Sequence, residues 1–317
     1  MPGYRLVNRL VRDTAAERRA LVSGLRATPA SIPPKYFYDA LGCALYGAIC
    51  ELPEYYPTRT ERAIFLAHRA DIARCIGRAR QFVDLGAGDS SKAEEWLAFI
   101  AATRYIAVDL AAAQMERALA RLAPEYPAVE MVGVIADFAA GLDLAAELGD
   151  DPATFFYPGS SIGNFTPVEA LAFLADLRRH CAAPGSGLLI GVDTKKDKVR
   201  LDAAYDDALG VTAAFNRNVL NHVNRLLGSN FVAEAYAHRA FYNAAEGRIE
   251  MHLEAIAPQT VLLEGLPRRF AAGERIHTEN SYKYAPAEFA ALLERSGFRG
   301  TRCWQDSAGD FAVFYAD

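Results

Sequence analysis

The sequence lacks the features that mark several protein classes. It has five cysteines in 317 residues, with no CxxC pair, and its six histidines show no spacing typical of metal ligands, such as HExxH. We therefore expect no disulfide framework and no metal site, and scattered thiols suit a reducing cytoplasm. No apolar run reaches the roughly 18 residues of a membrane helix, and the N-terminus has no apolar signal segment. The sequence thus predicts a cytoplasmic protein without a membrane partner.

Strong positive charge and a P-loop are also missing. The formal net charge is −5, no stripe of Lys and Arg is present, and no GxxxxGK[ST] motif occurs. These absences argue against nucleic acid as a partner and against a P-loop nucleotide site. What remains is a chain that is 52% hydrophobic and long enough for one large or two medium domains.

The most informative motif is a glycine pair between an apolar run and a helical pattern. The run Gln81–Leu85 ends at Gly86-Ala87-Gly88, and a helix is expected from Ser90. Ser91 stands where a dinucleotide motif has its third glycine. Acidic residues flank the glycines, at Asp84 and Asp89, which suits the ammonium and sulfonium of S-adenosylmethionine (SAM) better than a phosphate. Taken alone the glycine signal is weak, because a tight strand-to-helix turn also explains it, but the loop favours cofactor binding over a plain turn.

Two further apolar runs end in side chains that suit a nucleoside. Tyr105–Asp109 ends in a carboxylate that can accept both ribose hydroxyls, and Val129–Ala136 is followed by Asp137 and Phe138. Asp137 could accept from an adenine amino group, and Phe138 could lie on the ring. In a parallel sheet these ends meet at one edge, where ligands bind. Three consecutive strand ends favour a nucleoside site over three ordinary turns.

Alternating strand and helix patterns predict a doubly wound α/β sheet. Helices are expected at Ser90–Ala102, Ala112–Leu122, Pro167–Ala182 and Pro286–Ser296, and strands at Gln81–Leu85, Tyr105–Asp109, Val129–Ala136, Thr154–Tyr157 and Gly187–Val192. Cys303–Asp306 and Phe311–Tyr315 read as a terminal hairpin inserted into the sheet. We expect residues 61–196 and 285–317 to form this SAM-binding domain. The mostly helical residues 1–60 join 197–284 as a discontinuous α+β substrate-binding lobe, with one long helix at Asp206–Leu227 and a strand-like segment at Phe231–Tyr236.

Two segments carry side chains suited to an amino-acid substrate. After the fourth strand, Gly159 and Gly163 allow close backbone approach, and the amide oxygen of Asn164 can accept an amine N–H. Glu279 and Ser281 point to one face of an extended segment, where they could bind both nitrogens of an imidazole. A local turn bond at Asn164 and a solvated strand edge at residues 276–284 explain the same patterns. Phenols at Tyr38, Tyr55, Tyr56 and Tyr205 could bind a carboxylate or cover a cation, although most tyrosines serve packing.

Taken together, these stretches closely resemble the family of SAM-dependent histidine Nα-methyltransferases of ergothioneine biosynthesis. The matching segments are residues 33–39 (PPKYFYD), 52–61 (LPEYYPTRTE), 84–93, 157–165, 191–197, 215–218 (FNRN) and 277–284 (HTENSYKY). The resemblance implies a class I methyltransferase fold and three methylations of the α-amine of L-histidine, which give hercynine and three molecules of S-adenosylhomocysteine.

The resemblance also implies roles for individual residues. The SAM site is implied at Tyr38, Gly86, Lys92, Asp109, Asp137 and Phe138, and the amino-acid site at Tyr56, Gly159, Asn164, Tyr205, Met251, Glu279 and Ser281. Within it Glu279 and Ser281 hold the imidazole and Met251 packs beside it. Tyr38 and Asn164 are the expected catalytic residues, because they could orient a neutral amine, and no dedicated general base is evident. We expect a monomer acting on a small molecule. An N-methyltransferase for another amino acid, and a SAM-binding module without turnover, are the alternatives.

Overall fold

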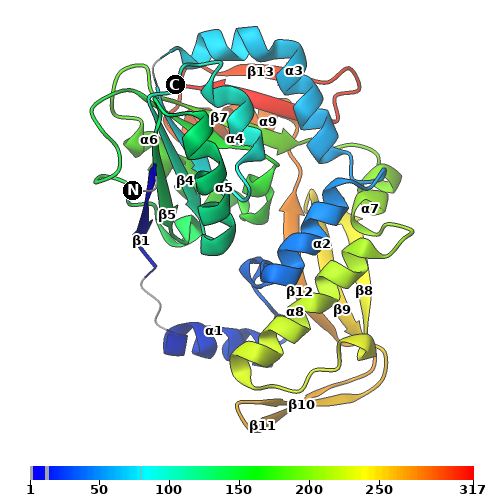
Figure 1. Cartoon of the computed structure of the whole chain (residues 1–317). Helices are drawn as coiled ribbons and strands as arrows, with labels where there is room; N and C mark the ends of the chain where they lie inside the picture. The colour runs from blue at the N-terminus through cyan, green and yellow to red at the C-terminus, as the bar shows by residue number, and fades with distance from the viewer. Residues whose placement is uncertain (1–2, 11–13, 79) are drawn as a thin grey trace. The chain divides into compact units, whose positions relative to one another are not determined.

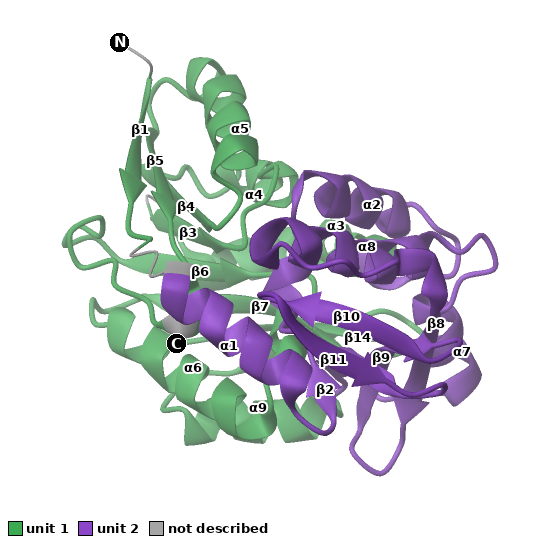
Figure 2. Ribbon diagram, turned by 90° about the horizontal axis from the view of Figure 1, so that it is seen from below, with its two compact units in different colours: residues 1–11, 59–194, 284–317 green, residues 12–58, 195–283 purple. Residues whose placement is uncertain are grey.

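The chain folds into two compact units, each made of discontinuous segments. The computed structural model describes residues 3–10, 14–78 and 80–317 (Figure 1). Unit 1 comprises the described residues of 1–11, 59–194 and 284–317, and unit 2 those of 12–58 and 195–283 (Figure 2). Among these residues, none of the helices combines the length and apolarity needed to cross a bilayer.

Unit 1 is built on an eight-stranded sheet of order β1-β5-β4-β3-β6-β7-β14-β13. In that order the strands are Tyr4–Asn8, Glu130–Ile135, Arg104–Asp109, Gln81–Leu85, Ala153–Tyr157, Gly187–Asp193, Phe311–Ala316 and Arg302–Gln305. The first six are parallel to their neighbours, whereas β14 runs antiparallel to β7 and pairs with β13. The doubly wound sheet with an inserted terminal hairpin is therefore confirmed.

Strand β1 is a correction to the sequence-based division of the chain. We expected residues 1–60 to be mostly helical and to belong to the substrate-binding lobe. Instead, Tyr4–Asn8 pairs in parallel with β5 at the edge of the unit 1 sheet. Its backbone groups complete a row of hydrogen bonds that β5 would otherwise leave open, and this long-range pairing has no local signal in the sequence.

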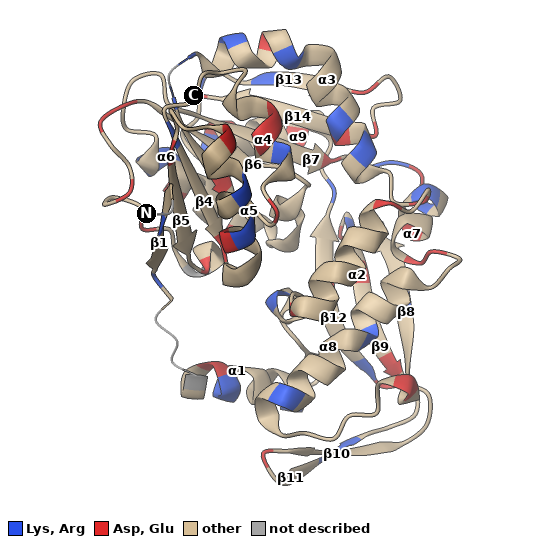
Figure 3. Ribbon diagram, viewed as in Figure 1, with Lys and Arg blue, Asp and Glu red and all other residues tan. Residues whose placement is uncertain are grey.

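The helices of unit 1 follow from the crossover connections between parallel strands. They are α3 (Pro57–Ile76), α4 (Ser91–Leu97), α5 (Ala112–Glu125), α6 (Pro167–His180) and α9 (Pro286–Arg295). Strands β3, β6 and β7 are buried along their whole length, as expected for a sheet with both faces covered. Helix α5 buries Met115, Leu119 and Leu122, and Figure 3 shows charges of both signs interspersed along it. A capping box between Thr166 and Glu169 begins α6.

Unit 2 has a four-stranded sheet of order β2-β12-β9-β8, with strands Ala30–Ser31, Arg275–Tyr282, Arg248–Ala255 and Tyr236–Asn243. A separate hairpin joins β10 (Gln259–Leu263) and β11 (Leu266–Phe270). Its helices are α1 (Thr14–Arg26), α2 (Ala40–Cys50), α7 (Lys198–Tyr205) and α8 (Val211–Leu227). Helix α8 contacts both α2 and the sheet (Figure 1), and apolar side chains from all three form one core.

Two predictions of secondary structure in unit 2 are wrong. The single helix expected at Asp206–Leu227 does not form, because Gly210 adopts a left-handed φ of 74° and α8 begins after it. The Asp207 carboxylate accepts from the backbone N–H groups of Val211 (2.9 Å) and Thr212 (2.8 Å), which fixes that start. The strand expected at Phe231–Tyr236 is a 3-10 turn at Ala233–Ala235, and β8 begins at Tyr236.

Candidate active site

The glycine loop lies at the centre of the unit 1 sheet, where the order in which strands are added changes side. Successive strands β3, β4 and β5 extend to one side of β3, and β6 and β7 extend to the other. The strand order therefore reverses between β3 and β6, and the carboxyl ends of strands at such a switch point are the usual ligand position in these folds. Gly86 and Gly88, directly after β3, have φ values of 74° and 54°, a left-handed conformation that favours glycine.

Asp109 at the end of β4 holds the glycine loop in place. One carboxylate oxygen accepts from the backbone N–H of Gly88 (2.8 Å), and the other accepts from that of Ala111 (2.7 Å). The carboxylate is therefore fixed at the loop and lies at the sheet edge, as the ribose interpretation requires. The other two acidic residues of the motif have local partners: Asp84 is buried and accepts from the Tyr105 hydroxyl (2.8 Å), and Asp89 accepts from the backbone of Ser91.

Phe138 brings a third strand end to the glycine loop. It begins a 3-10 turn (Phe138–Ala140) after β5, and its ring lies 3.9 Å from the point where a Cβ on Gly86 would stand. The ring also meets Tyr157 of β6 edge-on, at 5.8 Å between centroids. Asp137 is half-buried immediately before this turn. Gly86, Asp109 and Phe138 therefore lie at one edge of the sheet, and a glycine turn, a fixed carboxylate and an aromatic ring together fit the nucleoside part of SAM.

Glu61 is a buried residue that the sequence interpretation missed. It lies on α3, is 1% exposed, and one carboxylate oxygen accepts from Lys92 Nζ at 2.6 Å. The other oxygen accepts from the backbone N–H of Gly159 at 2.7 Å. Gly191 on β7 leaves room for it, because a Cβ there would lie 1.9 Å from the Glu61 carboxylate. Glu61 thus links Lys92, expected at the SAM site, to the loop after β6.

The loop after β6 carries Gly159 and Asn164, so these two expected substrate-binding residues belong to unit 1. Gly159 has a φ of 76°, and Asn164 ends a 3-10 turn (Ser161–Asn164), where it is half-buried. The Ser160 hydroxyl accepts from the backbone N–H of Asp193 at 2.9 Å, which ties the loop to the end of β7. The other expected substrate-binding residues, and Tyr38, all lie in unit 2.

A β-bulge in β12 directs Glu279 into the core of unit 2. His277 pairs with His252 of β9, but Glu279 pairs with Met251, so β12 advances two residues while β9 advances one. Without the bulge, Glu279 would lie on the same face as His277. With it, Glu279 and Ser281 share the face of Met251 and Ile249. All four side chains are buried, and the expected common face of Glu279 and Ser281 is confirmed for the described strand.

A buried hydrogen-bond network holds this bulge. The Thr278 hydroxyl shares its one proton between the side-chain oxygen of Asn216 (2.8 Å) and the Met251 carbonyl (3.0 Å). The Asn216 amide lies 2.8 Å from His238 Nδ1, and His238 Nε2 lies 2.8 Å from the carbonyl oxygen of Tyr205. These contacts match a neutral imidazole that accepts at Nδ1 and donates at Nε2. Burial lowers the pKa of His238 and favours the same neutral form.

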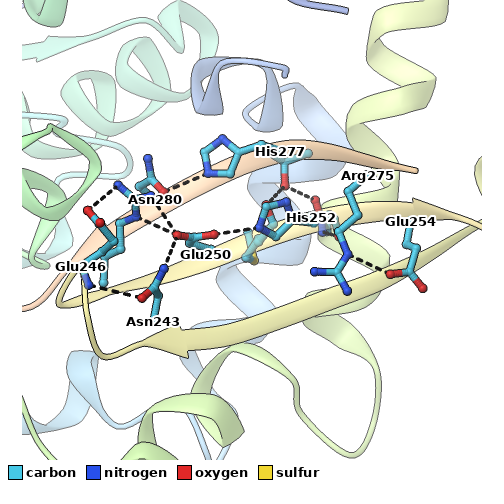
Figure 4. A network of polar contacts seen from close by, with 12 residues as sticks. Asn243, Glu246, Glu250, His252, Glu254, Arg275, His277 and Asn280 are labelled. Atoms are coloured by element: carbon cyan, nitrogen blue, oxygen red, sulfur yellow. Dashed lines mark hydrogen bonds and ion pairs between the residues drawn. The ribbon is translucent and has the colours of Figure 1, made fainter. Parts of the chain in front are cut away.

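The opposite face of the sheet carries a separate polar network (Figure 4). Glu250 accepts from Asn243, Arg248 and His252, and hydrogen bonds from these groups lower its pKa to about 2 against the cost of burial. His277 contacts Asn280 at 2.9 Å on this face. Glu250 is therefore an ionised carboxylate with several partners. Glu279 contrasts with it, because burial raises its pKa to about 7, although the positive charge of Lys283 acts in the other direction.

Ser281 and Tyr205 form a contact that also includes Lys283. The two hydroxyl oxygens lie 2.9 Å apart, and Lys283 Nζ donates to Tyr205 at 2.9 Å and to Ser281 at 2.8 Å. All three side chains are buried. The structure therefore brings Met251, Tyr205, Glu279 and Ser281 into one region of unit 2, and adds Lys283, which the sequence did not single out.

The other tyrosines that the sequence singled out, Tyr38, Tyr55 and Tyr56, have two kinds of surroundings in unit 2. Tyr38 is 41% exposed and contacts Tyr46 edge-on; Tyr46 contacts Tyr55, which in turn contacts Tyr205. Tyr56 is buried and has cationic neighbours. Its hydroxyl accepts from Lys196 Nζ at 2.6 Å, and the cationic group of Arg200 lies 4.9 Å from its ring centroid. Two cationic groups beside one phenol make this position suited to a carboxylate.

Comparisons with known proteins agree with this chemistry. A family model described as histidine-specific methyltransferase, SAM-dependent, matches residues 17–317. The Histidine N-alpha-methyltransferase of Mycolicibacterium smegmatis is 44% identical over 98% of both chains, and that of Mycobacterium tuberculosis is 41% identical over 95% of this chain and 94% of its own. Ergothioneine biosynthesis protein 1 of Neurospora crassa is 30% identical over 87% of this chain and 32% of its own length. The chain belongs to the SAM-dependent, histidine-specific methyltransferase family.

Proposed function

We propose that this enzyme transfers three methyl groups from SAM to the α-amino group of L-histidine and so forms hercynine, at the first step of ergothioneine biosynthesis. The observation that carries the proposal is the buried pair Glu279 and Ser281 on one face of β12. A carboxylate and a hydroxyl buried beside Met251 suit a small ring with one N–H and one acceptor nitrogen. A phenol or indole would leave one of them without a partner, at a cost of about 1–3 kcal/mol.

For the cofactor, we assign Gly86, Lys92, Asp109, Asp137 and Phe138 of unit 1 to SAM, with Tyr38 from unit 2. The fixed Asp109 carboxylate would accept the ribose hydroxyls, and Phe138 would lie against the adenine, with Asp137 near its amino group. Glu61 would position Lys92 and the Gly159 backbone without touching the cofactor itself. SAM supplies the electrophilic methyl group on its sulfonium.

For the amino acid, we assign Tyr56, Gly159, Asn164 and Tyr205 to the end that carries the carboxylate and amine. Lys196 and Arg200 place positive charge beside Tyr56, which favours a carboxylate there. Glu279 would accept a ring N–H, Ser281 would complete the other nitrogen, and Met251 would pack beside the ring.

The protein's contribution to catalysis is then the alignment of a neutral amine. Asn164 accepts an amine N–H and Tyr38 orients the amine, so that its lone pair faces the methyl carbon. Because the amine must be neutral and α-amino pKa values lie near 8, activity should rise with pH around that value. Phenols and an amide also tolerate the growing bulk of a partly methylated amine better than a tight ionic contact does.

A panel of amino acids tests the substrate assignment. Wild-type enzyme should methylate L-histidine far faster than L-tryptophan or L-tyrosine, and Glu279→Ala should reduce that preference. Glu254→Ala serves as the matched control. Glu254 lies in β9 of the same sheet and accepts a hydrogen bond from Arg275, its neighbour in β12. Equal rates for all amino acids, or an unchanged preference in Glu279→Ala, would contradict the assignment.

We also infer that the enzyme works as a cytoplasmic monomer, without nucleic acid or membrane as a partner. The five cysteines are scattered along the sequence with no CxxC pair, which suits a reducing compartment. Light scattering during gel filtration tests the monomer, for which we expect the mass of one 34.6 kDa chain; twice that mass would contradict it.

A further inference from the structure

Lys283 is a buried cation next to two residues assigned to the substrate. It directly follows β12, is 2% exposed, and donates to both the Tyr205 and Ser281 hydroxyls. Its ammonium also lies 4.8 Å from the centroid of the Tyr205 ring. Burying an ammonium is costly unless hydrogen bonds compensate it, and the two hydroxyl oxygens accept two of the hydrogens of Lys283.

The chemistry of the three groups restricts how their hydrogens point. An ammonium has three donors and no acceptor, whereas each hydroxyl has one donor and lone pairs. Both hydroxyl oxygens must therefore accept from Lys283. In the free protein one hydroxyl also donates to the other across the 2.9 Å contact. When a ligand replaces that contact, the Ser281 hydroxyl proton can point to the ligand, while Lys283 continues to donate to both oxygens.

We propose that Lys283 is a positioning residue for specificity, which makes Ser281 and Tyr205 hydrogen-bond donors toward the substrate. This inference rests on the proposed function. Ser281 then donates to the unprotonated ring nitrogen, Glu279 accepts from the ring N–H, and Tyr205 donates to the carboxylate. Only a neutral ring with one N–H and one acceptor nitrogen satisfies this set, and the Lys283 charge further disfavours an imidazolium.

The test compares two substrates in matched variants. L-histidine is measured against β-(2-thienyl)-L-alanine, which has a five-membered aromatic ring with neither a ring N–H nor an acceptor nitrogen. The measured quantity is the ratio of kcat/KM for the two substrates. Lys283→Met keeps the length of the side chain and removes its charge and donors. Because Ser281 is then no longer held as a donor, we expect the ratio to fall about tenfold, mainly through a higher KM for histidine.

Two controls separate positioning from a structural role. Lys198→Met changes an exposed lysine of the same unit and should leave the ratio within about twofold of wild type. In a Ser281→Ala background, Lys283→Met should have no further effect on the ratio, because the lysine acts through that hydroxyl. A general loss of stability would instead lower kcat/KM for both substrates together.

If Lys283→Met does not fold, Lys283→Gln provides the same comparison, since its shorter neutral amide cannot hold both hydroxyls; the ratio should fall at least about threefold. A ratio that stays within twofold of wild type in a folded variant overturns the proposal, as does a fall that persists in the Ser281→Ala background. Failure of the proposed function would appear differently, as wild-type enzyme that binds SAM and does not methylate histidine.

Discussion

Replacing Glu279 with glutamine should change how the stability of the protein depends on pH. Burial raises the pKa of Glu279 from its ordinary value of 4.5 to about 7 in the folded protein. Between those two values the folded protein holds one more proton than the unfolded chain. The free energy of unfolding must then fall as pH rises through this window, and the contribution becomes constant above pH 7.

The expected magnitude follows from the size of that change. Each tenfold change in acidity is worth about 1.4 kcal/mol, so ionising Glu279 in its buried site destabilises the folded state by roughly 3 kcal/mol. Glutamine has nearly the same shape and does not ionise. Relative to Glu279→Gln, wild-type protein should therefore lose roughly 3 kcal/mol of unfolding free energy between about pH 4 and pH 8.

Urea titrations of the ligand-free protein at several pH values measure this difference. The control is Glu254→Gln, because hydrogen bonds from Arg275 and Arg239 lower the pKa of Glu254, the opposite direction. Glu254→Gln keeps Glu279 and should therefore lose stability with rising pH as wild type does. Measured relative to Glu254→Gln, wild-type protein should gain unfolding free energy as pH rises, the opposite of its difference from Glu279→Gln. Curves for wild type and Glu279→Gln that stay parallel within about 0.5 kcal/mol would refute the argument that burial controls this carboxyl.

Other substitutions test the remaining parts of the account. Asp109→Ala should weaken SAM binding at least about tenfold in calorimetry, because the carboxylate fixes the glycine loop and is assigned to the ribose; unchanged affinity would contradict both roles. Gly191→Ala should destabilise the protein by about 2 kcal/mol or more, because its Cβ would meet the Glu61 carboxylate at 1.9 Å. Gly47→Ala, where a Cβ meets nothing within 4 Å on helix α2, should instead raise the melting temperature. Asn216→Ala should raise KM for histidine more than it lowers kcat, because the bulge that directs Glu279 loses a hydrogen-bond partner. If SAM affinity fell by the same factor as histidine KM rose, the effect would be general unfolding instead.

The unit 1 sheet could be predicted because its signals are local. Each parallel strand is an apolar run buried on both faces, and β3 forms at Gln81–Leu85, the range expected from the sequence. The glycine pair and the residues ending β4 and β5 then meet at one edge simply because parallel strands share a direction. Strand β1 escaped prediction because its pairing with β5 spans more than a hundred residues and its own pattern is short and partly exposed.

The amino-acid site was harder to predict because it depends on single-residue events. The spacing of Glu279 and Ser281 indicated a shared face, but a one-residue bulge at His277–Glu279 decides which face that is. Likewise, the left-handed Gly210 divides what reads as one long helix. Glu61 and Lys283 look like ordinary charged surface residues in the sequence, because a sequence does not show which charges are buried.

The most direct test of the central claim is mass spectrometry of purified enzyme incubated with SAM and L-histidine. The account predicts that mono-, di- and trimethylated histidine appear in succession, with fragmentation placing all three methyl groups on the α-nitrogen. Bound SAM with no methylated product would contradict the histidine assignment and favour a binding module without turnover, and methyl groups on a ring nitrogen would contradict the proposed roles of Glu279 and Ser281.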